Sequence, residues 1–360
     1  MEKTLPEVCI IQYGFPFDSS KFCSAEGVPL VRIRDVVRGY SETYTTEIAG
    51  ENYIVNDGDL LIGMDGEFNI AYWKGGRAYL NQRVCRLIPR EDVDRDYIFY
   101  YMPQALKAIE DATPFVTVKH LSAKQLSKIL IPLPDMREQQ RISAVLRSVD
   151  RVIAMRKKEL DELNHLVKSR FIELFGDADR FEAAPLDDNV VEMFIGPFGS
   201  SLKNECFVAA DQGYCMVYEQ KHAIKKTMDV DTRYINEKKY KELHRFTVRG
   251  GDIIVSCRGT IGETFIIPEG APFGIMHPSI MKIRLKASAY NRVFFNHLLQ
   301  TVLDRHAAEA NGSGVKMAIT ATALGKEHFI LPPMELQEQF ATFVEQTDKS
   351  KLCGKMEVAA

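Results

Sequence analysis

The stretch that decides the fold starts at a proline and reads Pro134-Asp135-Met136-Arg137-Glu138-Gln139-Gln140-Arg141-Ile142. A shorter version returns 198 residues later (332−134) as Pro332-Pro333-Met334-Glu335-Leu336-Gln337. Both have Met two residues and Gln five residues after the first proline, and a proline followed by polar residues is typical of a helix start. We therefore expect two related helices, each beginning where a globular region ends.

The first of these helices is predicted to be long. Steps of alternately four and three residues from Ile142 to Leu174 give ten positions, of which eight are apolar, and this pattern is typical of a coiled-coil seam. Asp135 with Glu138 predicts a capping box, and Gly176 predicts a left-handed stop. The 38 residues from Glu138 to Phe175 would span about 57 Å as a helix, so we expect a spacer. The apolar seam positions are Ile142, Leu146, Val149, Ile153, Leu160, Leu163, Val167 and Leu174.

The second helix is predicted to run from Met334 to Lys351, about half the length of the first. Phe340, Phe343 and Val344 lie on one side of it. Because this helix is too short to cover the whole seam, another protein or another copy of the chain is expected to cover the rest.

Segments outside the helices repeat as well. The run 17–21 is similar to 198–202 at an offset of 181 (198−17), and 55–61 is similar to 248–254 at an offset of 193 (251−58). Residues 81–87 and 277–283 alternate apolar with basic side chains, which predicts strands of a half-buried sheet with one wet face. Helices are expected at 97–109 and 290–309.

These observations predict an α+β fold built from two similar modules. The first module is expected at 1–134, the central helix at 135–176, the second module at 177–332 and a shortened helical region at 333–360. A chain of 360 residues suits two domains and a connecting element.

Composition narrows the possible locations and partners. No apolar run is long enough for a membrane span and the first residues lack a signal-peptide core, so we expect a cytoplasmic protein that does not bind membranes. Seven cysteines without a Cys-x-x-Cys pair predict buried or free thiols. The net charge of −3 argues against a general polyanion binder. Residues 221–249 are locally basic, which would suit either one basic face or a solvated surface of mixed charge.

No catalytic motif is found in the sequence. It contains no Asn/Asp-Pro-Pro-Tyr/Phe segment, no Walker loop and no His-Glu-x-x-His pair, and its eight histidines are scattered. We therefore predict no catalytic residue, no metal site and no cofactor.

Taken together, the motifs resemble the specificity subunit of a type I restriction-modification system. The resemblance rests on residues 14–21, 58–61, 251–254, 259–262 and 131–142. It implies a non-catalytic subunit in which two target-recognition domains each read half of a bipartite site in double-stranded DNA. It also implies helices that dock methyltransferase subunits, with a restriction subunit joining through the complex. The shortened second helix departs from the family pattern.

Candidate DNA contacts follow from side-chain chemistry. Arg32 and Arg34 flank Ile33 in a strand-like stretch, so both are expected on one face, where arginine can grip guanine. Alternatively, they form a surface pair bonded to Asp35 or Glu47. Hydroxyl and ammonium groups that could hold phosphates, or simply belong to capped loops, occur at Ser19, Ser20, Lys21, Ser200, Ser201 and Lys203. Further candidates are Arg83, Arg86, Lys221, Arg258, Thr260, Lys282 and Lys316.

Two other functions compete with DNA recognition. A single-chain nuclease or methyltransferase would need a catalytic domain for which the two modules leave no room. A helical scaffold that binds proteins through its two domains is equally compatible with the seam, but the duplicated Gly-Asp strands favour DNA. An uncovered seam also predicts self-association or dependence on a partner.

Overall fold

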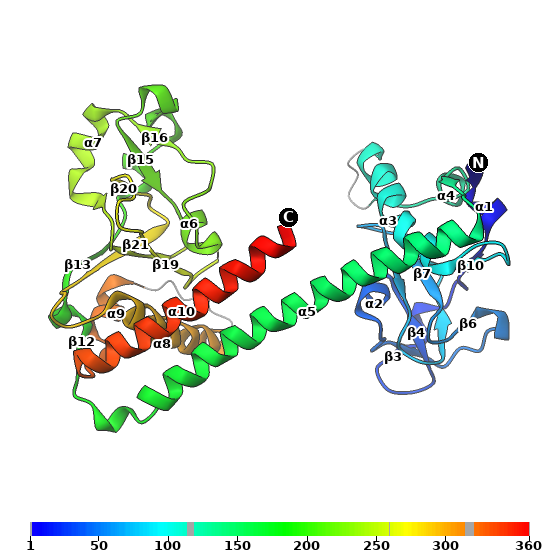
Figure 1. Cartoon of the computed structure of the whole chain (residues 1–360), viewed down its shortest axis with the longest axis horizontal. Coiled ribbons are helices and arrows are strands. Elements are labelled where there is room, and N and C mark those ends of the chain that lie inside the picture. Colours follow the sequence, from blue (N-terminus) through cyan, green and yellow to red (C-terminus); the bar gives the residue numbers. More distant parts are fainter. Residues whose placement is uncertain (1, 114–118, 259, 314–319, 360) are drawn as a thin grey trace. The chain divides into compact units, whose positions relative to one another are not determined.

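The computed structural model describes residues 2–113, 119–258, 260–313 and 320–359 (Figure 1). The chain divides into two compact units, Met1–Met155 and Arg156–Ala360. One helix of 40 residues, α5 (Met136–Phe175), belongs to both units and confirms the predicted central helix.

The first unit is mixed α and β. Its elements are β1 (Glu2–Thr4), α1 (Leu5–Val8), β2 (Cys9–Tyr13), η1 (Ser19–Lys21), β3 (Phe22–Cys23), β4 (Val28–Val31), α2 (Ile33–Arg38), β5 (Tyr44–Thr45), η2 (Glu51–Tyr53), β6 (Ile54–Val55), β7 (Leu60–Gly63), β8 (Asn69–Tyr72), β9 (Ala78–Leu80), β10 (Val84–Pro89), α3 (Arg95–Ala112), α4 (Ala123–Leu126) and β11 (Leu130–Pro132).

The second unit repeats the order of the strands and contains additional short helical segments. After α5 come η3 (Ala178–Arg180), β12 (Ala183–Pro185), η4 (Leu186–Asn189), β13 (Val190–Ile195), η5 (Gly199–Ser201), η6 (Asn204–Cys206), β14 (Phe207–Val208), η7 (Ala210–Gln212), β15 (Cys215–Tyr218), α6 (Gln220–Lys225), β16 (Tyr234–Ile235), α7 (Glu237–Leu243), η8 (His244–Phe246), β17 (Thr247–Val248), β18 (Ile253–Ser256), β19 (Thr264–Ile266), β20 (Gly274–Met276), β21 (Ile280–Leu285), α8 (Arg292–Ser313), α9 (Ala321–Lys326), β22 (His328–Ile330) and α10 (Met334–Ala359).

Strand pairing confirms the internal repeat. The sheets of the first unit have the orders β1-β11, β2-β10-β7-β8 and β3-β5-β4-β9-β6. Those of the second unit have the orders β12-β22, β13-β21-β18-β19 and β14-β16-β15-β20-β17, so every strand has a counterpart. Even the parallel pairs correspond, β4 with β9 and β15 with β20. Helices α3 and α8 confirm the two predicted within the modules.

In each unit, apolar clusters cover both faces of the four-stranded sheet. In β7, Leu60 and Ile62 pack against α3, whereas Leu61 belongs to a second apolar cluster with Val31 and Trp73. β18 alternates in the same way, because successive side chains of a strand point to opposite faces. The expectation of one wet face was therefore wrong for the sheets that contain β10 and β21. The strands also begin later than expected, at Val84 and Ile280, because the residues before them form turns.

Gln139 and Gln337 explain why the same signature opens both helices. The Gln139 side chain accepts a hydrogen bond from the Asp94 backbone N–H (2.8 Å) and donates one to the Pro134 carbonyl (2.9 Å). Gln337 makes the matching bonds with Asn291 N–H (2.9 Å) and the Pro332 carbonyl (2.8 Å). Each glutamine thus ties the start of its helix to the loop before α3 or α8.

The helix ends differ in detail from the prediction. Asp135 accepts from the Glu138 N–H (2.9 Å) as expected, but the Glu138 carboxylate pairs with Arg141. Gly176 is not left-handed: a Cβ there would lie 2.5 Å from the Ile172 carbonyl oxygen, so close approach accounts for the glycine. α10 is shorter than α5 but continues beyond Lys351, to a total of 26 residues.

The seam residues have different surroundings along α5. Ile142 borders the core of the first unit, Leu146 and Val149 are exposed, and Ile153, Leu160 and Leu163 are half-buried. In the second unit, α10 runs back along the last part of α5 (Figure 1). The side chains gathered there, with α8, include Val167, Leu174, Phe175, Phe294, Phe340, Phe343 and Val344.

Two further observations concern the described residues. No helix in the described ranges combines the length and apolar character needed to cross a lipid bilayer. Six of the seven cysteines, Cys9, Cys23, Cys85, Cys206, Cys215 and Cys257, carry free thiols, as expected.

Candidate nucleic-acid interface

A groove of about 510 Å³ in the first unit brings together candidates from three separate segments of the sequence. Its walls are formed by η1, by the junction of β4 with α2, and by the turn between β9 and β10. The lining residues are Phe17, Ser19, Phe22, Arg32, Ile33, Arg34, Asn81, Gln82 and Arg83. Four predicted DNA-contact residues, Ser19, Arg32, Arg34 and Arg83, therefore share one concave surface.

Backbone pairing explains why these segments meet. β4 pairs in parallel with β9, with Val31 opposite Leu80, so Arg32 and Asn81 follow neighbouring strand ends. Gly14 allows the backbone just after β2 to pass close to the turn between β9 and β10, because a Cβ at Gly14 would lie 2.1 Å from the Asn81 carbonyl oxygen. Gly196 is in the same position in the second unit, 2.3 Å from the His277 carbonyl oxygen.

The three arginines of the groove differ in their partners. Arg34 donates to the Thr43 hydroxyl (3.2 Å) and lies 3.8 Å from the buried Asp35 carboxylate. Arg83 pairs with Asp65 (2.9 Å). The Arg32 guanidinium lies over the Phe22 ring, 5.8 Å from its centroid.

The predicted local structure at Arg32 and Arg34 was wrong. β4 ends at Val31, Arg32 is the N-cap of α2, and Arg34 lies within that helix, so strand alternation does not place them. Both nevertheless line the groove, and the ion pair of Arg34 with Asp35, at 3.8 Å, fits the alternative interpretation for that residue.

The Ser19 to Lys21 segment is a capped turn. Asp18 accepts from the Ser20 N–H (2.9 Å), and Lys21 lies 4.0 Å from Glu47. These contacts fit the capping alternative for Ser20, whereas Ser19 faces the groove.

Candidates of the second unit lie on several elements. Ser200 and Ser201 form part of η5, and the exposed Lys203 is the N-cap of η6. Lys221 in α6 pairs with Glu219 (2.9 Å). Arg258 and Thr260 are exposed, and Lys316 lies outside the described residues.

Arg86 and Lys282 do not belong to an exposed surface. The Lys282 side chain is 1% exposed, and its ammonium donates to Glu192 (2.6 Å) and to the Thr247 carbonyl (2.8 Å). The Arg86 side chain is 15% exposed and pairs with Asp59 (2.8 Å). Arg86 and Lys282 occupy equivalent positions in β10 and β21, opposite Leu61 and Ile254. The prediction that they contact DNA is therefore replaced, and both are assigned as structural cations between the sheets.

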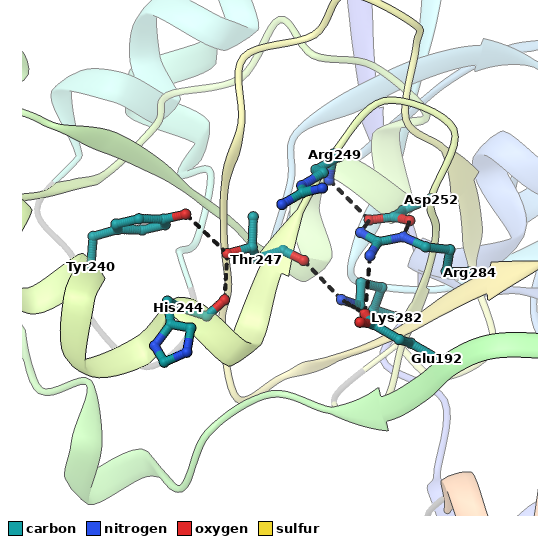
Figure 2. Close-up of polar contacts among 8 residues, drawn as sticks. All are labelled: Glu192, Tyr240, His244, Thr247, Arg249, Asp252, Lys282 and Arg284. Carbon is teal, nitrogen blue, oxygen red and sulfur yellow. Dashed lines mark hydrogen bonds and ion pairs between the residues drawn. The ribbon is translucent and has the colours of Figure 1, made fainter.

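Figure 2 shows the charged cluster around Lys282. Arg284 binds both carboxylate oxygens of the buried Asp252 (2.7 and 2.8 Å) and also approaches Glu192 (3.2 Å). Burial by itself would raise the pKa of Glu192, but the hydrogen bond from Lys282 and the neighbouring positive charges lower it overall. Burial lowers the pKa of Lys282. This cluster has the character of a satisfied structural network.

Five groove residues were not predicted as DNA contacts: Phe17, Phe22, Ile33, Asn81 and Gln82. The Asn81-Gln82-Arg83 run was interpreted as part of a strand, although polar residues between two short apolar runs also indicate a turn. That signal could have pointed to a loop presenting amide groups.

The family described as the type I restriction modification DNA specificity domain matches residues 1–165 and 210–354. Over 167 residues, 46% of the chain, the sequence is 40% identical to the type I restriction enzyme EcoBI specificity subunit of Escherichia coli. Over 160 residues, 41% of the chain, it is 26% identical to the MjaVIII specificity subunit of Methanocaldococcus jannaschii. The matches span 35% and 38% of the lengths of these relatives.

Two solved structures share the fold over the whole chain. A type I restriction-modification S subunit from M. genitalium aligns with a TM-score of 0.55 at 13% identity, covering 92% of that chain. A chain from a structure concerned with complex assembly and conformational transition of the type I R-M system aligns with a TM-score of 0.54 at 16% identity, covering 93% of that chain. At these identities the likeness concerns the fold alone.

Proposed function

The chain belongs to the type I restriction modification DNA specificity family, and we propose that it is the DNA-recognition subunit of such a system. Each unit reads one half of a bipartite site in double-stranded DNA. The observation that carries this proposal is the repetition of one set of sheets, strand for strand, in a single chain. A duplicated fold is suited to a target with two parts.

The chemistry of the groove supports the DNA proposal. Arginine, asparagine and glutamine are the side chains that pair with base edges, and serine can bond either bases or phosphates. The groove combines all four residue types, although the net charge of the chain is −3. Binding is therefore expected to depend on this surface and not on the overall charge.

The proposal also assigns roles along the chain. Residues 1–134 and 177–332 are the two target-recognition domains, 135–176 is the spacer helix, and 333–360 is the distal helical region. The helices dock methyltransferase subunits, and a restriction subunit joins through that complex in the cytoplasm. Exposed apolar side chains on α5, including Val145, Val149 and Val152, support docking on this helix. Catalysis is assigned to the partner subunits.

A selection of duplexes from a randomised pool tests DNA recognition. The full chain, alone and with a methyltransferase partner, is expected to retain duplexes that share two defined segments separated by unspecified bases. Retention should be measured at moderate and higher salt, because phosphate contacts without sequence preference weaken steeply with salt. Retention of unrelated sequences in both preparations would contradict the proposal.

A protein-binding scaffold is the second candidate function. The same exposed face of α5 favours it, since apolar side chains in water are typical of a protein interface. Assembly with a partner in the absence of any duplex preference would favour the scaffold, whereas selective duplex retention would favour DNA recognition.

A further inference from the structure

We propose that Arg32 is the residue with which the first unit reads a guanine in its half of the site. This inference rests on the proposed function, and it concerns one side chain of the groove. It separates Arg32 from Arg34 and Arg83, which line the same groove.

Among the three arginines of the groove, Arg32 is the one whose guanidinium remains free to bind a ligand. The Arg34 guanidinium donates to the Thr43 hydroxyl and lies 3.8 Å from the Asp35 carboxylate, and the Arg83 guanidinium pairs with Asp65. In the described part of the chain, no carboxylate pairs with the Arg32 guanidinium. Its planar group can therefore offer two parallel N–H donors to a ligand.

The surroundings of Arg32 also orient it. The Arg32 backbone N–H donates to the Asp35 carboxylate (2.9 Å), which anchors the residue at the start of α2. The Phe22 ring lies beneath the guanidinium and limits the planes that it can adopt. Both features reduce the conformational entropy that would be lost on binding.

Guanine is the base that matches this donor pair. Its major-groove edge presents two adjacent acceptors, O6 and N7, whereas adenine presents an acceptor beside an amino donor that would face an arginine N–H. An arginine free of carboxylate partners therefore discriminates between the two purines. Asn81 and Gln82 line the same groove and have amides that can contact neighbouring bases.

Comparison of the two units indicates that the fold does not require arginine here. Val31 lies opposite Leu80, and Tyr218 lies opposite Met276, in equivalent parallel pairs. The next residue is Arg32 in one unit and Glu219 in the other, and each is the N-cap of a six-residue helix. Glu219 is already paired with Arg233 and Lys221.

Framework positions behave differently, because they hold the same residue in both units. Examples are Gln139 with Gln337, which tie down the two helices, and Gly14 with Gly196, which pass close to a turn. A position whose charge differs between the two units, within a framework that is otherwise repeated, can serve to recognise different bases. The two halves of the site are accordingly expected to be read by different side chains.

The test compares full-length Arg32→Ala, Arg32→Lys and Arg38→Ala with the wild-type chain in the duplex selection. Arg32→Ala keeps the backbone N–H that donates a hydrogen bond to the Asp35 carboxylate, so the variant should fold. Arg38 is a matched control: it lies in the same helix, over Tyr40 (5.1 Å) and paired with Glu42 (2.7 Å), outside the groove. Thermal melting checks that all the variants are folded.

We expect both substitutions of Arg32 to remove the preference for guanine at one position of one half-site. A duplex with that guanine should be favoured about tenfold to one hundredfold over its adenine counterpart by the wild type and by Arg38→Ala. The ratio should approach one for Arg32→Ala, and Arg32→Lys should not restore it, because an ammonium lacks the bidentate fork.

Other results would overturn the inference without affecting the proposed function. If folded Arg32→Ala selected the same bases as the wild type, Arg32 would not read the site. If Arg32→Ala bound all duplexes equally more weakly, with a smaller salt dependence, Arg32 would contact a phosphate. If the wild-type chain itself selected no sequence, the proposed function would fail first.

Discussion

At the scale of single residues, the buried glutamines have the clearest structural role. Gln139 and Gln337 are almost fully buried, and each joins a helix start to the loop before another helix of the same unit. A buried side chain that satisfies several backbone groups at once is costly to remove, because those groups lose their partners without gaining water.

We predict that Gln139→Ala and Gln337→Ala each lower the free energy of unfolding by about 1 to 3 kcal/mol. Each substitution leaves one backbone N–H and two backbone carbonyl groups without their side-chain partner. Urea unfolding of the full chain measures the change. Gln140→Ala is the control, since Gln140 is exposed on the same turn of α5. Equal effects of Gln139→Ala and Gln140→Ala would contradict the assigned role.

Glu192 should make stability depend on pH. Its pKa in the folded chain lies below the usual value of 4.5, because the bond from Lys282 and the nearby positive charges outweigh the effect of burial. A carboxylate with a lowered pKa stabilises the fold above its unfolded pKa, and that contribution is lost as the pH falls through the folded pKa.

We predict that Glu192→Gln is less stable than the wild type at pH 7 and that the difference shrinks as the pH falls below about 4.5. The buried Lys282 ammonium loses its carboxylate partner in the variant at every pH, whereas the wild type loses it only on acidification. Urea unfolding across this pH range tests the prediction. Glu345→Gln, at an exposed position of α10, should show no such convergence. A constant difference at all pH values would rule out Glu192 as the titrating group.

At the scale of elements, α5 combines covered and exposed apolar segments. Its last part packs within the second unit, but Val149 and Val152 are 48% and 53% exposed. An apolar stripe with about half of each side chain in water is typical of a helix that binds a partner.

We predict that Val149→Glu with Val152→Glu prevents assembly of the chain with itself or with a methyltransferase subunit. The added carboxylates would have to be desolvated in an apolar interface, which is unfavourable. Light scattering at micromolar concentration, with and without the methyltransferase, gives the mass of the particles. Ala154→Glu is the control, since it adds one carboxylate on the opposite side of the helix. If the double variant assembled normally, this face of α5 would not be the surface that binds the partner.

At the scale of the whole molecule, the chain is two copies of one architecture. The same three sheets, the same parallel pair and the same buried glutamine occur in both units. The copies differ in side-chain charge at the equivalent helix N-caps Arg32 and Glu219.

We predict that replacing residues 1–134 with the same region of a related specificity subunit changes one half of the selected DNA site and leaves the other half unchanged. The reason is that each unit has its own sheets and its own apolar clusters. Selection from a randomised duplex pool measures both halves at once. The reciprocal replacement of residues 177–332 should change the other half. A replacement that altered both halves together would contradict independent reading.

The long helix and the repeat could be predicted from the sequence because their signals are local. A heptad pattern needs only residues three or four apart, and the Pro-Met-Gln spacing is confined to one helical turn and its cap. The family resemblance also follows from the order of such local motifs, and it agrees with the family match over residues 1–165 and 210–354.

Only the tertiary structure decided which cations are exposed. Alternation along 81–87 and 277–283 assigns Arg86 and Lys282 to one side of a strand, but it does not reveal that a second layer covers that side. Likewise, Ser19, Arg32 and Arg83 meet because β4 and β9 pair in parallel across a long stretch of chain. Local periodicity depends on neighbours in sequence, whereas burial and the groove depend on which distant segments pair.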